Sequence, residues 1–143
     1  SVVTYIKYGE DVCSPVIEKG EADVIVSFEE LEAARWLSYL KKGGKIITNT
    51  QQVEPMPVIT GAAEYPSDII SKLKAKNVDV TAIDALALAN EAGSSKAVNV
   101  VLMGVLSKSM GFPESVWEKA LEECVPPKAI EINRKAFELG ENA

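Results

Sequence analysis

The strongest constraint on this chain is a short apolar run that leads directly into a helix-like segment and then into a second apolar run. Residues 23–27 read Asp-Val-Ile-Val-Ser, which is typical of a buried strand. We predict a helix immediately after it, with Ser27 as its N-cap and Gly43-Gly44 as its end. Residues 45–48 (Lys-Ile-Ile-Thr) then read as the next strand. A strand–helix–strand unit of this length predicts a parallel strand pair with a right-handed crossover.

Strand-like and helix-like segments continue to alternate along the chain. Clusters of β-branched and aromatic residues predict further strands at residues 2–6, 12–13, 57–60 and 78–83. Capping residues and prolines predict helices that begin near Ser67, Asp84, Ser94, Pro113 and Pro127. We therefore expect one domain over residues 1–143, an α/β fold with three α/β/α layers on a mostly parallel sheet and a helical C-terminal part.

Charge and composition exclude several classes of function. The chain has 143 residues and a formal net charge of −6, which argues against nucleic-acid binding because phosphate contacts need clustered Lys and Arg. It has no histidine, so the commonest general base and metal ligand is missing. No apolar run is long enough to span a membrane and no signal peptide is visible, so we expect a cytoplasmic protein without a membrane partner.

The two cysteines do not form a recognisable site. Cys13 and Cys124 are far apart and neither belongs to a C-x-x-C pair, so the chain shows no zinc or iron–sulfur framework of its own. Cys124 lies on an apolar helical stripe with Trp117 and Leu121 and is expected in the core, whereas Cys13 is expected at the surface. We expect neither thiol to be catalytic.

Polar residues follow two of the predicted strands. Ser27 and Glu29 come at the end of one strand, and Asn49 and Thr50 come at the end of the next. In open α/β sheets ligands bind beyond the carboxyl ends of the strands, so these residues are candidate contacts for a ligand or a partner subunit. The alternative is structural: Ser27 caps a helix, and Asn49 and Thr50 shape a loop. The residue pattern favours this alternative.

Other polar residues also have two interpretations. Glu29, Glu30 and Glu32 could serve as acid–base carboxylates, but their place at a helix start favours a role in complementing the helix dipole. Asn99 could contact a ligand, although a bond to neighbouring backbone across the core is favoured. Asn133 shares a helical face with apolar residues and is expected to point inward or to an interface, where a satisfied structural amide is favoured over a ligand contact. The sequence has no G-x-G-x-x-G, P-loop or G-x-S-x-G motif, so no independent active site is visible.

An ordered set of segments resembles a known family of enzyme subunits. These segments lie at residues 14–15, 20–26, 29–33, 39–44, 49–50, 97–104, 133 and 136–137. The set is similar to the small (beta) subunit of indolepyruvate:ferredoxin oxidoreductases and to the gamma subunit of pyruvate and 2-ketoisovalerate:ferredoxin oxidoreductases. Residues 14–15 and 29–33 look closer to the indolepyruvate type.

The resemblance implies a role as a non-autonomous subunit. Enzymes of this family oxidatively decarboxylate 2-oxoacids to acyl-CoA and pass the electrons to ferredoxin. In the family, thiamine diphosphate and the four-iron four-sulfur clusters belong mainly to the large partner subunit, so we expect no cofactor bound by this chain. The chain would then work in a complex with the large subunit, CoA and a 2-oxoacid, and would serve ferredoxin only indirectly.

One departure from the family pattern concerns the start of the chain. Family members usually open with a strand and a Gly-rich G-x-G-G-x-G turn, whereas this chain begins at Ser1-Val2-Val3. We expect about the first quarter of the family domain to be absent, which would expose an apolar sheet edge and make a homodimer a candidate state. The departure keeps a second hypothesis open, in which the chain is a stand-alone α/β domain that binds a small ligand or regulates without catalysis.

Overall fold

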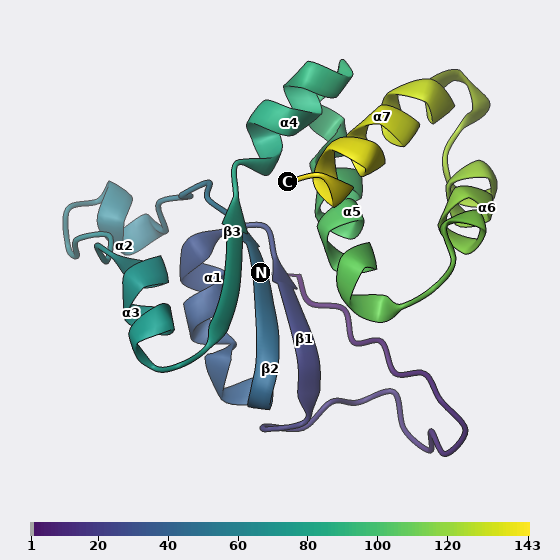
Figure 1. Ribbon diagram of the computed structural model, residues 1–143. Coiled ribbons are helices and arrows are strands. Elements are labelled where there is room, and N and C mark those ends of the chain that lie inside the picture. The colour runs from purple at the N-terminus through teal and green to yellow at the C-terminus, as the bar shows by residue number, and fades with distance from the viewer. Residues whose placement is uncertain (1) are drawn as a thin grey trace.

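The sheet of this domain consists of three parallel strands in the order β1-β2-β3 (Figure 1). The computed structural model describes residues 2–143, so Ser1 of the predicted domain lies outside the described residues. Both strand pairs are parallel, with Ile25 opposite Ile46 and Ile46 opposite Val80, which confirms the predicted parallel pair. The strands are β1 (Ala22–Ser27), β2 (Leu40–Asn49) and β3 (Asp79–Ile83).

Helices flank the sheet and form the C-terminal part of the chain (Figure 1). Asp84 caps the helix after β3 as predicted, because its carboxylate accepts a hydrogen bond of 2.9 Å from the N–H of Ala87. The helices before β3 are α1 (Glu30–Arg35), α2 (Met56–Ile59) and α3 (Ile69–Ala75). The helices after β3 are α4 (Ala85–Ala92), α5 (Val98–Met110), α6 (Glu114–Cys124) and α7 (Ile130–Glu141). Single turns of 3-10 helix are η1 (Leu37–Tyr39), η2 (Ser95–Ala97) and η3 (Pro127–Ala129).

Successive side chains of the central strand enter two separate cores. Ile46 packs with Ala33, Ile69 and Leu73, so α1 and α3 cover one face of the sheet. Ile47 packs instead with apolar side chains of α4, α5 and α7, which cover the other face. Because successive residues of a strand point to opposite faces, two neighbouring isoleucines anchor both helical layers. The predicted three-layer α/β/α arrangement is therefore confirmed.

Helices α5 and α7 cross with their backbones in direct contact. Gly104 on α5 faces the carbonyl of Phe137, and Gly140 on α7 faces the carbonyl of Val101. A Cβ atom on Gly104 would stand 2.2 Å from the Phe137 oxygen, and one on Gly140 would stand 2.0 Å from the Val101 oxygen. Both distances are far below van der Waals contact, so only glycine allows the two helices to approach this closely.

The helix after β1 is shorter than the sequence predicts. α1 ends at Arg35, and residues 41–44 belong to β2 instead of to a last helical turn. The register of β1 on β2 shifts between Ala22 and Val24, so residues 41–44 leave the regular ladder. Gly43 has a φ of +81° in this irregular stretch, a conformation that favours glycine. The glycine pair therefore serves a strand irregularity and not a helix end.

Several other predicted elements are wrong. Residues 2–6 and 12–13 form no strand, because their backbone has no neighbouring strand with which to pair. Residues 57–60 lie in and just after α2, where Pro57 stands in the first turn and fixes a helical φ. α3 begins after Asp68, whose φ of 58° is left-handed, and not at a cap formed by Ser67.

Replacement of Gly104 by alanine tests the crossing of α5 and α7. In an exposed helix this change would stabilise by roughly 1 kcal/mol, but here the new Cβ meets backbone atoms that have no rotamer to change. We expect Gly104→Ala to lower the free energy of unfolding by about 2 kcal/mol or more, as measured by chemical denaturation. Ser109→Ala, at an exposed position of the same helix, is the control. Unchanged stability of Gly104→Ala would show that the two helices can move apart far enough to accept the methyl group without cost.

Candidate functional site

The side chain of Asn49 joins the carboxyl ends of all three strands. Asn49 is the last residue of β2 and is fully buried. Its Nδ2 donates to the carbonyl of Phe28, just after β1, at 3.3 Å, and its Oδ1 accepts from the N–H of Ala85 at 3.1 Å. Ala85 is the first residue of α4, which follows β3 directly. The structural interpretation of Asn49 therefore has direct support, and its contact with a ligand stays a prediction.

Ser27 shapes the turn after β1 and does not cap α1. Its hydroxyl donates to the carbonyl of Glu29 at 2.6 Å and accepts from the Glu29 N–H at 3.3 Å. The capping residue is Glu29, so the predicted Ser27 cap is wrong. Thr50 lies at the same edge of the sheet, where its N–H donates to the carbonyl of Ile83 at 2.9 Å. The structure thus brings Ser27, Glu29, Asn49 and Thr50 to one edge.

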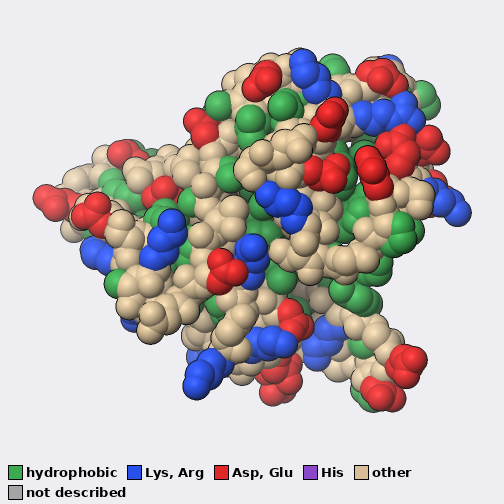
Figure 2. All heavy atoms as spheres, viewed as in Figure 1, with side chains coloured by type: hydrophobic (Ala, Val, Ile, Leu, Met, Phe, Trp, Pro, Cys, Tyr) green, Lys and Arg blue, Asp and Glu red, His purple; other side chains and the backbone are tan. Residues whose placement is uncertain are grey.

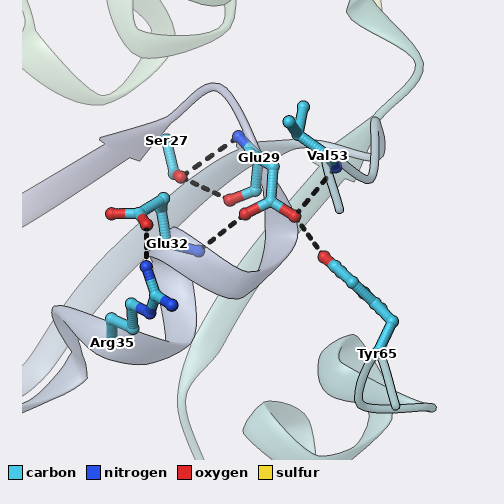
Figure 3. A network of polar contacts seen from close by, with 6 residues as sticks. All are labelled: Ser27, Glu29, Glu32, Arg35, Val53 and Tyr65. Atoms are coloured by element: carbon cyan, nitrogen blue, oxygen red, sulfur yellow. Dashed lines mark hydrogen bonds and ion pairs between the residues drawn. The ribbon is translucent and has the colours of Figure 1, made fainter. Parts of the chain in front are cut away.

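The carboxylate of Glu29 is shared between the start of α1 and a distant segment of the chain (Figure 3). Glu29 is only 8% exposed. Its Oε2 accepts from the N–H of Glu32 at 2.9 Å, which is the capping bond of α1. Its Oε1 accepts from the N–H of Val53 at 3.3 Å and from the hydroxyl of Tyr65. The predicted role of this carboxylate at the helix start is confirmed, because both of its oxygens are bonded within the chain.

Tyr65 belongs to this cluster although it lies 36 residues from Glu29 in the sequence. Burial of its hydroxyl, followed by the hydrogen bond to Glu29 and the negative charge of that carboxylate, raises the pKa of Tyr65 above its ordinary value. A second link between the same segments comes from Gln52, whose Nε2 donates to the carboxylate of Glu30 at 3.1 Å. Sequence reasoning missed Tyr65 and Gln52, because a proline-rich stretch has no periodicity to show which side chains turn inward.

The other predicted polar residues play no part in this network. Asn99 is exposed on the first turn of α5, so the predicted bond across the core is wrong. Asn133 is half-buried and donates to the carbonyl of Ala129 at 2.8 Å, which confirms a structural amide. Cys13 and Cys124 are both exposed and unpaired with each other. The predicted burial of Cys124 is wrong, because α6 contains no buried residue.

A second polar network joins α6 to α7. Figure 2 shows acidic side chains gathered at the upper right of the molecule, where Figure 1 places these helices. Arg134 on α7 pairs with Glu118 and Glu122 on α6, and with Glu131 one turn before it on α7. Hydrogen bonds to Glu118 and Glu131 raise the pKa of Arg134, which keeps it charged. This network is a solvent-exposed bridge between two helices, of the kind that adds little stability for each ion pair.

The polar side chains at the carboxyl edge of the sheet are engaged in hydrogen bonds within the chain. Within residues 2–143, no three His, Cys, Asp or Glu side chains are grouped to hold a metal ion. Over the same residues, no helix is both long and apolar enough to cross a membrane.

The polar side chains of Ser27, Glu29 and Asn49 are bonded inside the chain, while Phe28 is 55% exposed in the same turn. Exposed aromatic rings of this kind are enriched where proteins contact one another.

Comparison with known proteins decides the family. Residues 1–143 match the family described as pyruvate ferredoxin/flavodoxin oxidoreductase. The chain belongs to this family. It is 44% identical over 148 residues to indolepyruvate oxidoreductase subunit IorB of Thermococcus kodakarensis and 43% identical, also over 148 residues, to the subunit of the same name from Pyrococcus horikoshii. Each alignment covers 100% of this chain and 73% of the relative, and the family resemblance seen in the sequence is confirmed.

Solved structures of this oxidoreductase family share the fold. The gamma subunit of a keto/oxoacid ferredoxin oxidoreductase from Geobacter sulfurreducens has a TM-score of 0.63 at 23% identity, over 89% of this chain and 66% of that one. Pyruvate oxidoreductase subunit PORC from Thermotoga maritima has a TM-score of 0.58 at 21% identity, over 84% of this chain and 62% of that one. The chain thus spans a little under two thirds of each subunit, and the likeness establishes the fold.

Asn49→Ala tests the amide that joins the strand ends. The change removes the partner of the Ala85 N–H and of the Phe28 carbonyl. We expect the free energy of unfolding to fall by about 2–3 kcal/mol, because buried polar groups without partners are costly. Asn90→Ala, at an exposed position of α4, is the matched control for chemical denaturation. A loss no larger than that of the control would mean that water replaces the amide.

Glu29→Gln tests the part that Glu29 plays in the raised pKa of Tyr65, to which burial of the hydroxyl contributes most. Removal of the negative charge should lower this pKa toward its ordinary value, as followed by NMR of ¹³C-labelled tyrosine. Because the folded-state pKa is raised, the stability that this tyrosine contributes is fully present below its unfolded pKa of about 10 and is lost as the pH rises through its folded pKa. Glu32→Gln is the control, since the carboxylate of Glu32 bonds to Arg35 instead. An unmoved Tyr65 titration in Glu29→Gln would contradict this assignment.

Proposed function

We propose that this chain is the small subunit of a 2-oxoacid:ferredoxin oxidoreductase of the indolepyruvate type. The observation that carries the proposal is the identity of 44% and 43% to two subunits named IorB, in alignments that cover the whole chain. Such an enzyme oxidatively decarboxylates a 2-oxoacid to acyl-CoA and passes the electrons to ferredoxin. In this role the chain is a non-autonomous part of the oxidoreductase, and it acts only when it is assembled with a partner.

We assign the redox cofactors to a large partner subunit. Iron–sulfur clusters are held by sets of Cys thiolates, whereas this chain has two cysteines, Cys13 and Cys124, both exposed and far apart in sequence. These residues do not fit a cluster. Thiamine diphosphate and the four-iron four-sulfur clusters therefore belong to the large subunit in this proposal, CoA and the 2-oxoacid bind within the complex, and ferredoxin receives its electrons from the large subunit.

The carboxyl edge of the sheet is the part of the chain that we assign to contact with the partner or its ligands. Ser27, Glu29, Asn49 and Thr50 lie there together, and Asn99 is a separate exposed candidate on α5. The buried polar groups of this edge hold its shape, so the contact itself would be made by backbone atoms and by the exposed ring of Phe28. The proposal also includes a cytoplasmic location and, as a candidate state, a homodimer formed through an exposed sheet edge.

Reconstitution tests the proposed role directly. Co-expressed anaerobically with the candidate large subunit, the chain should co-purify with it. The complex should reduce ferredoxin or a viologen dye in a reaction that depends on indolepyruvate and CoA. Each chain alone should be inactive, because this chain carries no redox cofactor and the large subunit, which carries the cofactors, needs this chain to complete the enzyme. Pyruvate and branched-chain oxoacids are the competing substrates that define the type.

A variant pair locates the contact within this experiment. Phe28→Ser should weaken co-purification. Phe112→Ser, in the α5–α6 connection, should not, although the ring of Phe112 also contacts Tyr8 and Trp117. If the complex forms but only pyruvate is used, the indolepyruvate type is wrong and the subunit role stands. If an intact large subunit neither binds the chain nor gains activity from it, the chain is instead a stand-alone α/β binding or regulatory domain.

A further inference from the structure

The segment between β2 and α3 lies outside both cores of the domain, apart from the ring of Tyr65. We call residues 52–66 the strap. Figure 1 shows it at the left of the view, where it carries α2 beside α1 and α3. Its backbone hydrogen bonds stay within the segment, as shown by the N–H groups of Val58 and Ile59, which both donate to the carbonyl of Pro55. The strap is therefore a small folded unit that makes no backbone ladder with the sheet.

Burial of apolar side chains does little to hold the strap in place. Val53, Met56 and Ile59 are 57%, 67% and 61% exposed. Tyr65 is different, since its ring packs against the core beneath α1 and α3. Because the hydrophobic contribution scales with the apolar area removed from water, the polar contacts of the strap must supply a large share of its attachment.

These polar contacts converge on two consecutive glutamates. The side chain of Gln52 donates to Glu30 at 3.1 Å. The N–H of Val53 donates to Oε1 of Glu29 at 3.3 Å, and the hydroxyl of Tyr65 donates to the same oxygen (Figure 3). Val53 and Tyr65 lie near the two ends of the strap, so one carboxylate oxygen accepts a hydrogen bond from each end. We call these two bonds to Glu29 the clasp.

Glu29 is well placed to act as a fixed anchor. Its other oxygen caps α1 through the N–H of Glu32, which sets the orientation of the carboxylate independently of the strap. Hydrogen bonds to an ionised acceptor are roughly twice as strong as those between neutral groups. The Tyr65 hydroxyl is protonated and can donate throughout the neutral range, as any tyrosine is, and its raised pKa extends this to more alkaline pH.

We propose that Glu29 controls whether the strap is attached to the carboxyl end of the sheet or detached from it, and we call Glu29 the latch. With the clasp closed, residues 52–66 keep one conformation, and Val53, Met56 and Ile59 are held on a defined surface. With the clasp open, the strap detaches as a unit, while the three strands and both cores stay folded. Segments with few buried apolar contacts open locally in this way. The inference concerns this chain alone and does not rest on the proposed subunit role.

Hydrogen exchange followed by mass spectrometry on the chain tests the latch. Tyr65→Phe removes one bond of the clasp and keeps the packed ring. We expect exchange of the strap amides, including those of α2, to rise by about tenfold or more, since a hydrogen bond to a charged group is lost. Exchange in β1, β2, α5 and α7 should stay unchanged. Tyr39→Phe, a half-buried tyrosine outside the strap, is the matched control.

Glu29→Gln and the double variant provide the second part of the test. The glutamine keeps the side-chain size but loses the charge that serves both bonds, so strap exchange should rise at least as far as in Tyr65→Phe. Because both changes break the same clasp, the double variant should exchange no faster than Glu29→Gln alone. Three results overturn the proposal: strap exchange that is unchanged in Tyr65→Phe, a rise that is equal across the whole sheet, or two effects that simply multiply.

Discussion

The carboxyl end of the sheet depends on one buried amide. Parallel strands deliver their ends to the same edge, and there the chain must leave each strand with its backbone polar groups satisfied. The amide of Asn49 supplies a donor for the turn after β1 and an acceptor for the first N–H of α4. A carboxylate lacks the donor and an ammonium lacks the acceptor, so neither could replace it. The turn of Ser27 and the cap of Glu29 lie on either side of the Phe28 carbonyl that this amide binds.

The sequence predicts those parts of the fold that depend on neighbouring residues. The apolar runs that became β1 and β2 are recognisable because a strand buried on both faces needs consecutive hydrophobic residues. Asp84 is recognisable as a cap because its carboxylate and the N–H that it accepts are three residues apart. The family is recognisable for a different reason: many short segments, each only weakly specific by itself, occur in a fixed order along residues 1–143.

The sequence does not predict features that depend on distant partners. Glu29 meets Tyr65 across 36 residues, and no local pattern marks either side chain as half of a pair. α1 ends early because the pairing of β1 with β2 places residues 41–44 in the strand. Here tertiary pairing outweighs the local helical propensity. Cys124 lies on an apolar stripe, but its helix faces α7 and solvent instead of the sheet. At the candidate site, sequence order places the residues at one edge, and the structure alone shows what each of them bonds.

The contact between the backbones of α5 and α7 has a mechanical consequence. Helices that are separated by long side chains can shift against each other, because rotamers adjust to small displacements. Gly104 and Gly140 place no side chain between the two helices that could adjust in this way, since each faces a carbonyl of the other helix. We therefore expect the two helices to shift little against each other. The outlying α6 is attached to this pair of helices by the exposed ion pairs of Arg134 and by the packing of Trp117 and Leu121, so it is held less firmly than α5 and α7 hold each other.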